Sequence, residues 1–305
     1  MLHSPLLTSP RKQGEEYPIL NGPGVTDMKG GVIVLLKALE ALEQTPFKDN
    51  LGWEVLINPD EEIGSPGSRS LYKDIAQRNH LGLIFEPCMP EGTLVSTRKG
   101  SGNFTLVIHG KAVHAGRDYG SGRNAVVALA DAITSLDALA GTRPGLIVNC
   151  GIVEGGTTVN TVPDLAILRF NIRIDHPDDR AYAEQQISAF VAEIGERDGF
   201  SACLHGGFGR APKPVTEGIQ RLQKAIEECG STLGIPIGWQ PSGGVCDGNN
   251  LAEHGLPNID TMGVRGGNIH SDQEYLITDS LLERSQLTAL LLMRLASGEL
   301  NWDGK

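Results

Sequence analysis

The hydrophobic positions of this chain change their spacing several times, and these changes divide it into segments. After a glycine-rich turn, the strongly apolar run 32–42 predicts a helix that is buried over most of its surface. The shorter apolar runs 53–57 and 81–85 predict strands, and each is followed closely by acidic residues. Amphipathic patterns at 219–229 and 280–296 predict two helices near the end of the chain. This alternation of strands and helices is typical of an α/β fold.

The middle of the chain has a different pattern, with strands that alternate between apolar and polar positions. The predicted elements, in order, are a strand at 103–110, a helix at 124–140, strands at 146–153 and 165–174, a helix at 177–193 and a strand at 200–204. This β-α-β-β-α-β order is typical of a ferredoxin-like sandwich. We therefore predict an inserted second domain at residues 93–206. Residues 1–92 and 207–305 are expected to form one α/β domain, with a mostly parallel sheet and helices on both faces.

Composition limits the partners and the compartment of this protein. The chain has 305 residues, enough for two domains, and its formal net charge of −11 argues against nucleic acid or an anionic membrane as a partner. Its five cysteines are scattered and odd in number, which favours a reducing compartment such as the cytoplasm. No stretch is apolar for long enough to span a bilayer, and residues 1–5 lack the regions of a signal peptide.

Acidic residues follow both predicted strands of the first segment. Asp60, Glu61 and Glu62 come after the first strand, and Glu86 comes after the second. Because the carboxyl ends of parallel strands meet at one edge of a sheet, we expect these acids to lie close together. A buried cluster of acids requires a cation or protons to hold it together. For the three consecutive acids alone, a solvated loop is the commoner explanation.

Two further residues could join such a cluster. Asp27 lies in the glycine-rich turn at the start of the first helix, where it could instead cap the helix. His270 follows another glycine turn, although a lone histidine is more often structural than a ligand. A standard phosphate-binding loop is excluded, because the pattern G-x-x-x-x-G-K-[ST] is absent. Together, Asp27, Glu62, Glu86 and His270 offer the mixed carboxylate and imidazole ligands that suit zinc.

An ordered set of short motifs resembles the co-catalytic zinc aminoacylase and carboxypeptidase family. That family includes glutamate carboxypeptidase, acetylornithine deacetylase and succinyl-diaminopimelate desuccinylase. The matching stretches are GPGVTDMKGG at 22–31, DEEIGS at 60–65 with GSR at 67–69, EP at 86–87, GKAVHA at 110–115, NTVP at 160–163 and HS at 270–271. Each stretch alone is weak, but the ordered set is specific and spans nearly the whole chain. The spacing of the acidic loop is most similar to the glutamate carboxypeptidase branch.

The resemblance implies roles for the acidic residues and for His270. Asp27 would bridge two zinc ions, Glu62 and His270 would complete one site, and Glu86 would serve the other. Glu61 would be the general base, which takes a proton from water and later gives it to the leaving amine. The alternative is that Glu61 only orients the cluster.

The resemblance also implies residues that bind substrate and a second subunit. His114 of the inserted domain would reach the active site of a partner in a homodimer and stabilise the oxyanion, unless it is only a surface residue at a strand end. Asn160 and Arg173 would hold the substrate carboxylate, although Arg173 could instead form an ion pair on the sheet surface. Gly243 and Gly244 would lie beside the substrate.

The chain departs from the family pattern near its beginning. The family has a His-x-Asp motif upstream of the position of Asp27, and this motif is absent here. We therefore expect an N-terminally truncated, incomplete version of the zinc exopeptidase-like domain, in which the site of Glu86 holds zinc weakly. Cys246 stands where family members often have threonine, and we interpret it as a small loop residue, not a nucleophile.

These observations predict a zinc-dependent metallopeptidase or amidohydrolase. Its substrate would be a small peptide or N-acyl amino acid, cleaved at an amide bond next to a free carboxylate, as in a glutamate carboxypeptidase-like exopeptidase. Two alternatives stay open. The chain could be an N-acyl amino acid deacylase of the same family, or a catalytically impaired remnant that acts only as a dimerising or binding module.

Overall fold

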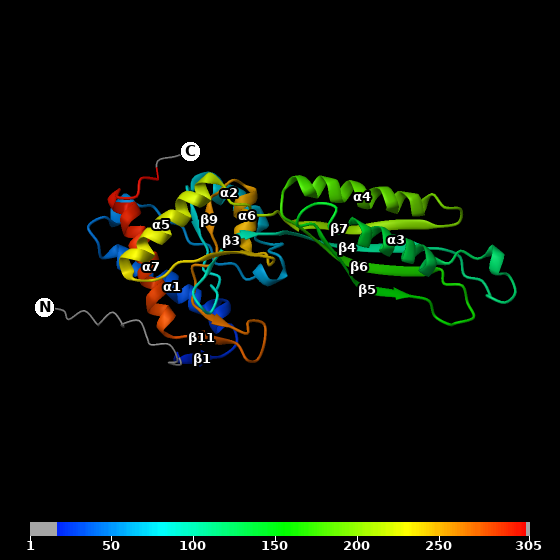
Figure 1. Cartoon of the computed structure of the whole chain (residues 1–305), viewed down its shortest axis with the longest axis horizontal. Coiled ribbons are helices and arrows are strands. Elements are labelled where there is room, and N and C mark those ends of the chain that lie inside the picture. Colours follow the sequence, from blue (N-terminus) through cyan, green and yellow to red (C-terminus); the bar gives the residue numbers. More distant parts are fainter. Residues whose placement is uncertain (1–16, 303–305) are drawn as a thin grey trace.

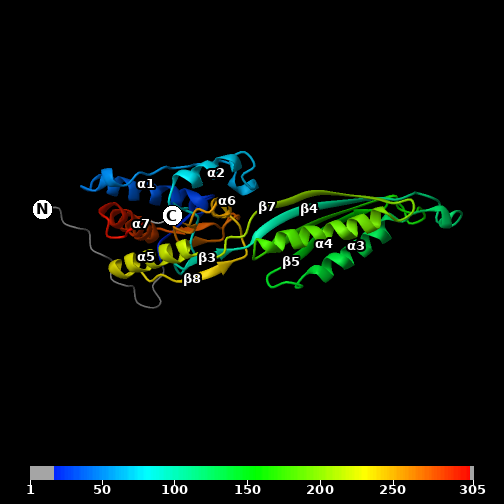
Figure 2. The same cartoon turned by 90° about the horizontal axis from the view of Figure 1, so that it is seen from above.

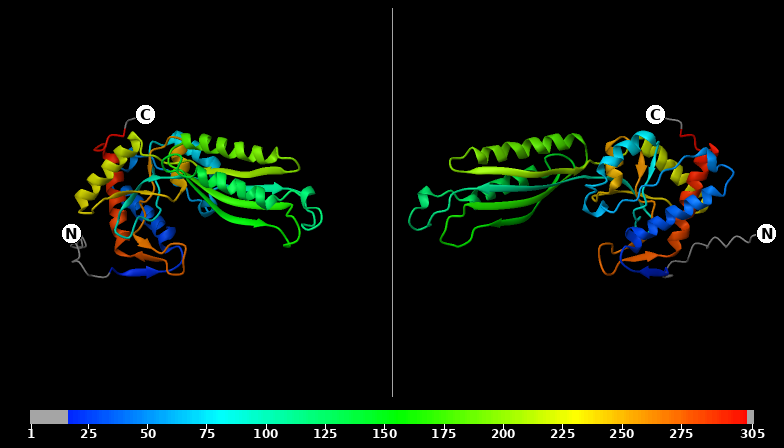
Figure 3. Two further views of the ribbon diagram at one scale, coloured as in Figure 1. Left: turned by 45° about the vertical axis from the view of Figure 1, so that its right-hand side comes forward. Right: turned by 180° about the vertical axis from the view of Figure 1, so that it is seen from behind.

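Two large hydrophobic clusters organise residues 17–302, the part of the chain that this computed structural model describes (Figure 1). One cluster lies within residues 100–210, which we call the inserted unit. The other lies in the segments on either side, which we call the main unit. The inserted unit projects from one side of the main unit, so that the molecule is elongated (Figure 3).

The inserted unit contains a four-stranded sheet with two helices on one face (Figure 2). Its strands are β4 (Gly100–His109), β5 (Ile147–Gly155), β6 (Leu165–Ile174) and β7 (Ser201–Arg210), and its helices are α3 (Ala125–Leu139) and α4 (Asp178–Gly195). The strand order is β5-β6-β4-β7, and all neighbouring strands are antiparallel. This order and connectivity give the topology of a ferredoxin-like sandwich.

The alternation of buried and exposed side chains along these strands explains why the two helices pack on one face of the sheet. In β4, Phe104, Leu106 and Ile108 are buried, whereas the residues between them are more exposed. Their apolar face packs against α3, which buries Leu129 and Leu136. The period of two in the strands thus places one face of the sheet against the helices and leaves the other face exposed.

The main unit has small sheets and no continuous parallel sheet among its described residues. β1 (Ile19–Asn21), β11 (Tyr275–Ile277) and β10 (Gly266–Gly267) form an antiparallel group; β2 (Gly82–Leu83) pairs parallel with β9 (Asn258–Ile259), and β3 (Leu94–Arg98) pairs parallel with β8 (Trp239–Ser242). The fold is a mixed α/β fold. The prediction of one mostly parallel sheet is wrong for the part of the chain described, because parallel pairing is limited to these two strand pairs and one isolated bridge between Cys88 and Arg265.

The predicted strand at 53–57 does not form. Residues 51–58 have no assigned secondary structure, and none of them belongs to a strand or bridge. A cavity of about 460 Å³ lies between this segment and the region of β2, and Ile57 and Phe85 are among the residues on its walls. An extended segment becomes a strand only when its backbone groups are paired, and no described segment pairs with this one. The acidic loop therefore follows an unpaired segment.

The helices of the main unit pack around these short sheets. They are α1 (Gly30–Glu43), α2 (Arg69–Arg78), α5 (Glu217–Leu233), α6 (Asp247–Glu253) and α7 (Asp279–Ser297), and shorter helical turns are η1 (Val25–Lys29), η2 (Lys48–Asn50), η3 (Glu61–Ile63) and, in the inserted unit, η4 (Tyr119–Ser121). Within the described residues, no helix combines the length and the apolar character needed to cross a membrane.

The first helix is less buried than its sequence predicts. α1 buries one stripe, which includes Val34, Ala38 and Leu42, and packs along α7. Ile33 and Leu36, on another side of the helix, are 45% and 48% exposed. Burial over most of the helix surface is therefore a wrong prediction, because α7 covers only one side of this apolar helix.

Candidate metal centre

Three side chains from distant parts of the chain converge at one edge of the main unit. Asp27, Glu62 and His270 each place one ligand atom within 4.8 Å of the others. His270 Nε2 lies 3.1 Å from Asp27 Oδ2 and 3.4 Å from Glu62 Oε2. His270 also has a φ of 63°, a left-handed conformation that is uncommon outside glycine and recurs at functional sites. The structure thus brings together three of the four predicted metal ligands.

Glu86, the fourth predicted ligand, lies buried beside this group. Burial, together with repulsion from Asp27 and Glu61, raises the pKa of Glu86 to about 9. Without a cation this carboxyl group is protonated at neutral pH, and a nearby cation would favour its ionised form. The donor set is three carboxylates and one imidazole, which suits a divalent ion such as zinc. The residues present therefore fit a metal centre.

A buried glutamate holds the turn that carries Asp27. Glu274 accepts hydrogen bonds from the backbone N–H groups of Gly24 (2.7 Å), Thr26 (2.8 Å) and Asp27 (2.9 Å). Although burial alone would raise it, these N–H groups lower the pKa of Glu274. Asp27 does not cap α1, because the residue at the cap is Lys29 and no side chain bonds there. Sequence reasoning missed Glu274; its only local signal is an acid shortly after His270.

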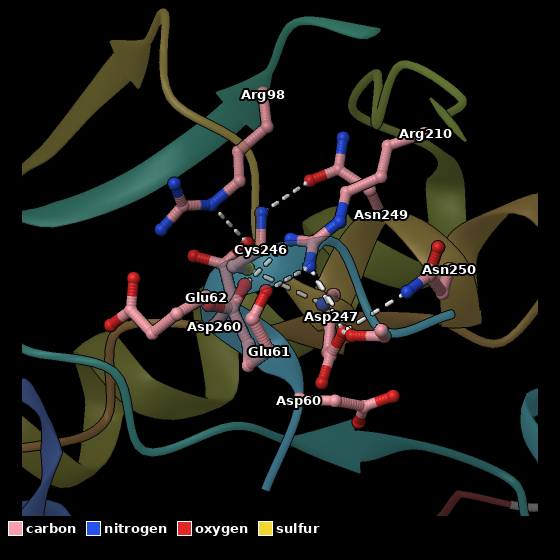
Figure 4. Close-up of polar contacts among 12 residues, drawn as sticks. Asp60, Glu61, Glu62, Arg98, Arg210, Cys246, Asp247, Asn249, Asn250 and Asp260 are labelled. Atoms are coloured by element: carbon pink, nitrogen blue, oxygen red, sulfur yellow. Dashed lines mark hydrogen bonds and ion pairs between the residues drawn. The ribbon is translucent and has the colours of Figure 1, made fainter. Parts of the chain in front are cut away.

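Arg210 binds the predicted general base. Its Nη1 donates to Glu61 Oε1 at 2.6 Å, and its Nη2 donates to the backbone oxygen of Glu61 at 3.0 Å. Figure 4 shows the Arg210 side chain reaching toward Glu61 and Asp247. Burial raises the pKa of Glu61, and the charge of Arg210 only partly opposes this effect. The sequence gives no local signal for this contact, because an arginine at a strand end is common on protein surfaces.

Asp60, the first acid of the loop, has a structural role. Its carboxylate accepts hydrogen bonds from the backbone of Gly67 (2.7 Å) and Ser68 (3.0 Å) and from the Ser68 hydroxyl. The Ser68 hydroxyl is the main reason that the pKa of Asp60 falls to about 2. Asp60 therefore closes the loop that presents Glu61 and Glu62, and it is not one of the clustered metal ligands.

A second cavity adjoins the acidic loop on the side of the inserted unit. Its volume is about 530 Å³, and its walls include Glu61, Glu62, Asn171 and Arg173. Arg173 Nε donates to Asn171 Oδ1 (3.0 Å), and its Nη1 donates to the backbone oxygen of Gly243 (2.8 Å). Within residues 17–302, the partners of the Arg173 guanidinium are this amide and this backbone oxygen and not an acid, so the predicted alternative of a surface ion pair is not observed.

The glycine turn lies close to this cavity. Gly243 touches Arg173 through the hydrogen bond above, and the Gly244 N–H donates to the Ser242 hydroxyl at 3.1 Å. The next residues, Val245 and Cys246, differ in exposure: Val245 lines the cavity, whereas Cys246 is buried and burial raises the pKa of its thiol. The Cys246 sulfur accepts the N–H of Gly248, which agrees with a small structural residue at the start of α6.

His114 and Asn160 lie together, far from the acidic loop of the same chain. The Ala115 N–H donates to the Asn160 carbonyl at 2.9 Å, and the backbones of His114 and Thr161 form an antiparallel β-bridge. Both residues belong to loops at the tip of the inserted unit, beyond the ten-residue strand β4 (Figure 1). A strand of that length spans about 33 Å. The structure therefore separates Asn160 from Arg173, which sequence reasoning had grouped at one carboxylate.

Known proteins are similar to this chain in sequence and in fold. The family described as Peptidase family M20/M25/M40 matches residues 7–294. Carboxypeptidase G2 of Pseudomonas sp. (strain RS-16) is 31% identical over 286 residues, which cover 91% of this chain and 68% of that protein. Succinyl-diaminopimelate desuccinylase of Rhodospirillum rubrum is 26% identical over 299 residues, which cover 90% of this chain and 74% of that protein. Among solved structures, aminopeptidase PepT from Bacillus cereus shares the fold with a TM-score of 0.76 at 22% identity, covering 88% of this chain and 71% of its own.

Proposed function

The chain belongs to peptidase family M20/M25/M40, and on this basis we propose that it is a zinc-dependent hydrolase of amide bonds next to a free carboxylate. The observation that carries the proposal is the convergence of Asp27, Glu62 and His270 beside Glu61. The similarity to a carboxypeptidase supports an exopeptidase that removes a C-terminal residue.

The metal ligands are the four residues of the candidate centre. Asp27, Glu62 and His270 would hold one ion, and Glu86 together with Asp27 would face a second. When bound, such ions lower the pKa of water from about 15.7 toward ~7 and polarise the amide carbonyl. The raised pKa of Glu86 supports this assignment, because its causes are burial and, second, repulsion from Asp27 and Glu61, and a bound cation would offset both.

Glu61 is the proton carrier of the proposed reaction. Burial raises its pKa, which makes its carboxylate a better base than an exposed glutamate. Oε1 is bonded to Arg210, whereas Oε2 accepts no hydrogen bond from residues 17–302. Oε2 is therefore free to accept the proton of the attacking water and to pass it to the leaving amine.

Arg173 recognises the free carboxylate of the substrate. Its guanidinium lines the cavity next to Glu61 and Glu62 and has no acidic partner within the described residues. A guanidinium can bind a carboxylate through two parallel hydrogen bonds. Gly243 and Gly244 leave room beside this position, because they carry no side chains.

A second copy of the chain completes the site. His114 and Asn160 would enter from the tip of a partner's inserted unit, His114 to stabilise the oxyanion and Asn160 to assist in binding the carboxylate. The unpaired edge of β5 supports dimerisation through the inserted unit, because Ile152 and Val153 on this strand are 50% and 54% exposed.

A second candidate function is removal of an acyl group from an N-acyl amino acid. The similarity to a desuccinylase favours it, and the same centre would catalyse it. In both functions the leaving amine carries a free α-carboxylate, so the two functions differ in the acyl group that is removed: a peptide in the first, and a small acyl group such as succinyl in the second.

Hydrolysis of a matched set of substrates tests the proposal. The zinc-loaded protein is incubated with a peptide, its C-terminally amidated form and an N-succinyl amino acid, and free amine is measured. We expect release from at least one free carboxylate substrate, little from the amide, and a loss of about 10³-fold in Glu61→Gln. Glu40→Gln, a surface change on α1, should keep full activity. Equal rates for Glu61→Gln and the unchanged protein would contradict the proposal.

A further inference from the structure

We propose that Arg210 positions Glu61 for proton transfer, by binding one carboxylate oxygen so that the other remains free. This inference rests on the proposed role of Glu61 as proton carrier. Arg210 is the last residue of β7, where the chain leaves the inserted unit, yet its side chain is only 4% exposed. Burying a guanidinium costs free energy unless a nearby acid balances its charge.

Two acids match the charge of Arg210, and they differ in how firmly they are held. Asp247, at the start of α6, lies 3.3 Å from Arg210 Nη2 and also accepts hydrogen bonds from Ser65, Asn250 (3.0 Å) and Asn58 (2.9 Å). Among the residues that the structure describes, the Glu61 carboxylate has no such network, and Arg210 is the residue that donates to it. The firmly held Asp247 therefore fixes Arg210, and Arg210 in turn fixes Glu61.

The backbone of the crossing point is fixed as well. The chain passes between the two units twice, next to Arg98 and next to Lys213. The backbones of these two residues are hydrogen-bonded to each other, and both side chains bind Asp260, at 2.8 and 2.6 Å. The Asn249 amide donates to one backbone carbonyl in each crossing, at 3.0 and 2.7 Å. Arg210 therefore enters the site from a backbone that the main unit holds in place.

The shape of the guanidinium suits this role better than that of an ammonium group. Arg210 donates to the Glu61 side chain through Nη1 and to the Glu61 backbone through Nη2, so it grips both ends of the residue. Without it, the Glu61 side chain could turn into the open 530 Å³ cavity. A displacement of about 1 Å of a reacting group can cost on the order of 10²-fold in rate.

Kinetics of Arg210→Gln and Arg210→Lys test the positioning role. In Arg210→Gln we expect kcat to fall by about 10²-fold while KM changes less than about threefold, with unchanged zinc content. Arg210→Lys should recover part of kcat, because it keeps the charge but loses the fork. The control is Arg197→Gln, which removes two surface ion pairs of the inserted unit, with Asp131 and Glu193. A rise in KM with unchanged kcat would overturn the inference, since Arg210 would then bind substrate.

A double-mutant cycle in thermal unfolding separates this inference from the proposed function. Tm is measured for Glu61→Gln, Arg210→Lys and the double variant. We expect the double variant to lose clearly less than the sum of the single losses, because both single changes break one contact. Additive losses would overturn the Arg210–Glu61 link. If the unchanged protein hydrolyses no substrate while the cycle shows coupling, the proposed function fails and the link stands.

Discussion

Carboxyl groups near Asp27 have pKa values that move in opposite directions, and their environments explain why. Hydroxyl and backbone donors lower the pKa of Asp60 to about 2. Backbone N–H groups lower the pKa of Glu274, although the burial of Glu274 has the opposite effect. Burial raises the pKa of Glu61, and burial with nearby acids raises that of Glu86 to about 9. The first two carboxylates have all the donors they need and shape loops. Glu86 is buried beside other acids, and the one side chain that donates to Glu61 among the described residues, Arg210, does not offset the burial of Glu61. Raised pKa values of this kind are typical of groups that take up protons or cations.

At Glu86 this difference predicts a variant that separates stability from metal binding. Glu86→Gln is expected to keep or slightly raise the Tm of the metal-free protein, because a neutral amide of similar shape replaces a carboxyl group that must take up a proton to be buried there. The same variant should lose most of the stabilisation by zinc, which for the unchanged protein is about 2.7 kcal/mol at a zinc concentration of 100 Kd and is observed as a rise in Tm. Differential scanning fluorimetry with and without zinc measures both effects. An undiminished zinc response would show that Glu86 is not a ligand.

At Glu274 the prediction concerns the geometry of a ligand. Glu274→Gln replaces an acceptor of three N–H groups with an amide, so we expect a loss of about 2 kcal/mol in unfolding free energy. Zinc affinity should fall by about tenfold, because Asp27 is no longer held in place. Urea unfolding and zinc titration measure these changes. Asp272→Asn, a change at a nearby exposed acid, should alter neither quantity. Unchanged zinc affinity in Glu274→Gln would contradict the role of Glu274.

At the scale of elements, long-range pairing decided which apolar runs became strands. Residues 53–57 and 81–85 have similar patterns, but only the second run contains a paired strand, β2, because β9 lies beside it. The strands β4 to β7 formed throughout, because each has a neighbour over most of its length. The junction between the units is a further element, and one buried carboxylate, Asp260, holds it together.

This junction predicts a dependence of stability on pH. Burial tends to raise the pKa of Asp260, but Lys213 and Arg98 hold it below the ordinary value. The folded state therefore gains stability from the ionised Asp260 above about pH 4, and loses it as the pH falls further. We expect Asp260→Asn to cost about 3–5 kcal/mol at pH 7, because two buried cations lose their partner.

Urea unfolding at pH 7, 5 and 3 measures the cost of Asp260→Asn. The difference in unfolding free energy between the variant and the unchanged protein should be similar at pH 7 and 5 and should be smaller at pH 3. Asp131→Asn, which removes a surface ion pair with Arg197, serves as the control and should change stability by less than about 1 kcal/mol. A difference that stays constant down to pH 3 would contradict the assignment of the charge to Asp260.

At the scale of the whole molecule, the length of the inserted unit separates groups that the proposed reaction requires together. Glu61 lies at the base of this unit, and His114 lies at its tip. The strands between them are too long for one chain to bring both to the same substrate. A dimer in which each tip reaches the other subunit's acidic loop would resolve this separation.

Mixing two inactive variants tests such a shared site. Glu61→Gln and His114→Ala should each have little activity alone. In mixed dimers, one of the two sites combines an intact Glu61 with an intact His114, so random mixing should restore about a quarter of full activity. The measurement is hydrolysis after the two variants are unfolded together and refolded. No recovery, with dimers present by light scattering, would show that His114 does not act across subunits.

The sequence by itself determined the chemistry and the local elements. Asp27, Glu61, Glu62, Glu86 and His270 stand in short motifs whose residue types and order can be read along the chain. The ferredoxin-like pattern of the inserted unit was equally readable, because the alternation of apolar positions is a local property of a strand that packs on one face.

Only the tertiary structure decided how these parts work together. Arg210 meets Glu61 across 149 positions, and Glu274 meets the turn of Asp27 across nearly 250, so no local pattern could reveal either contact. No segment within residues 17–302 pairs with the backbone of residues 51–58, and helix packing buries only one stripe of α1. The separation of Asn160 from Arg173 follows from the length of folded strands. In each case the deciding contact joins segments whose proximity exists only after folding.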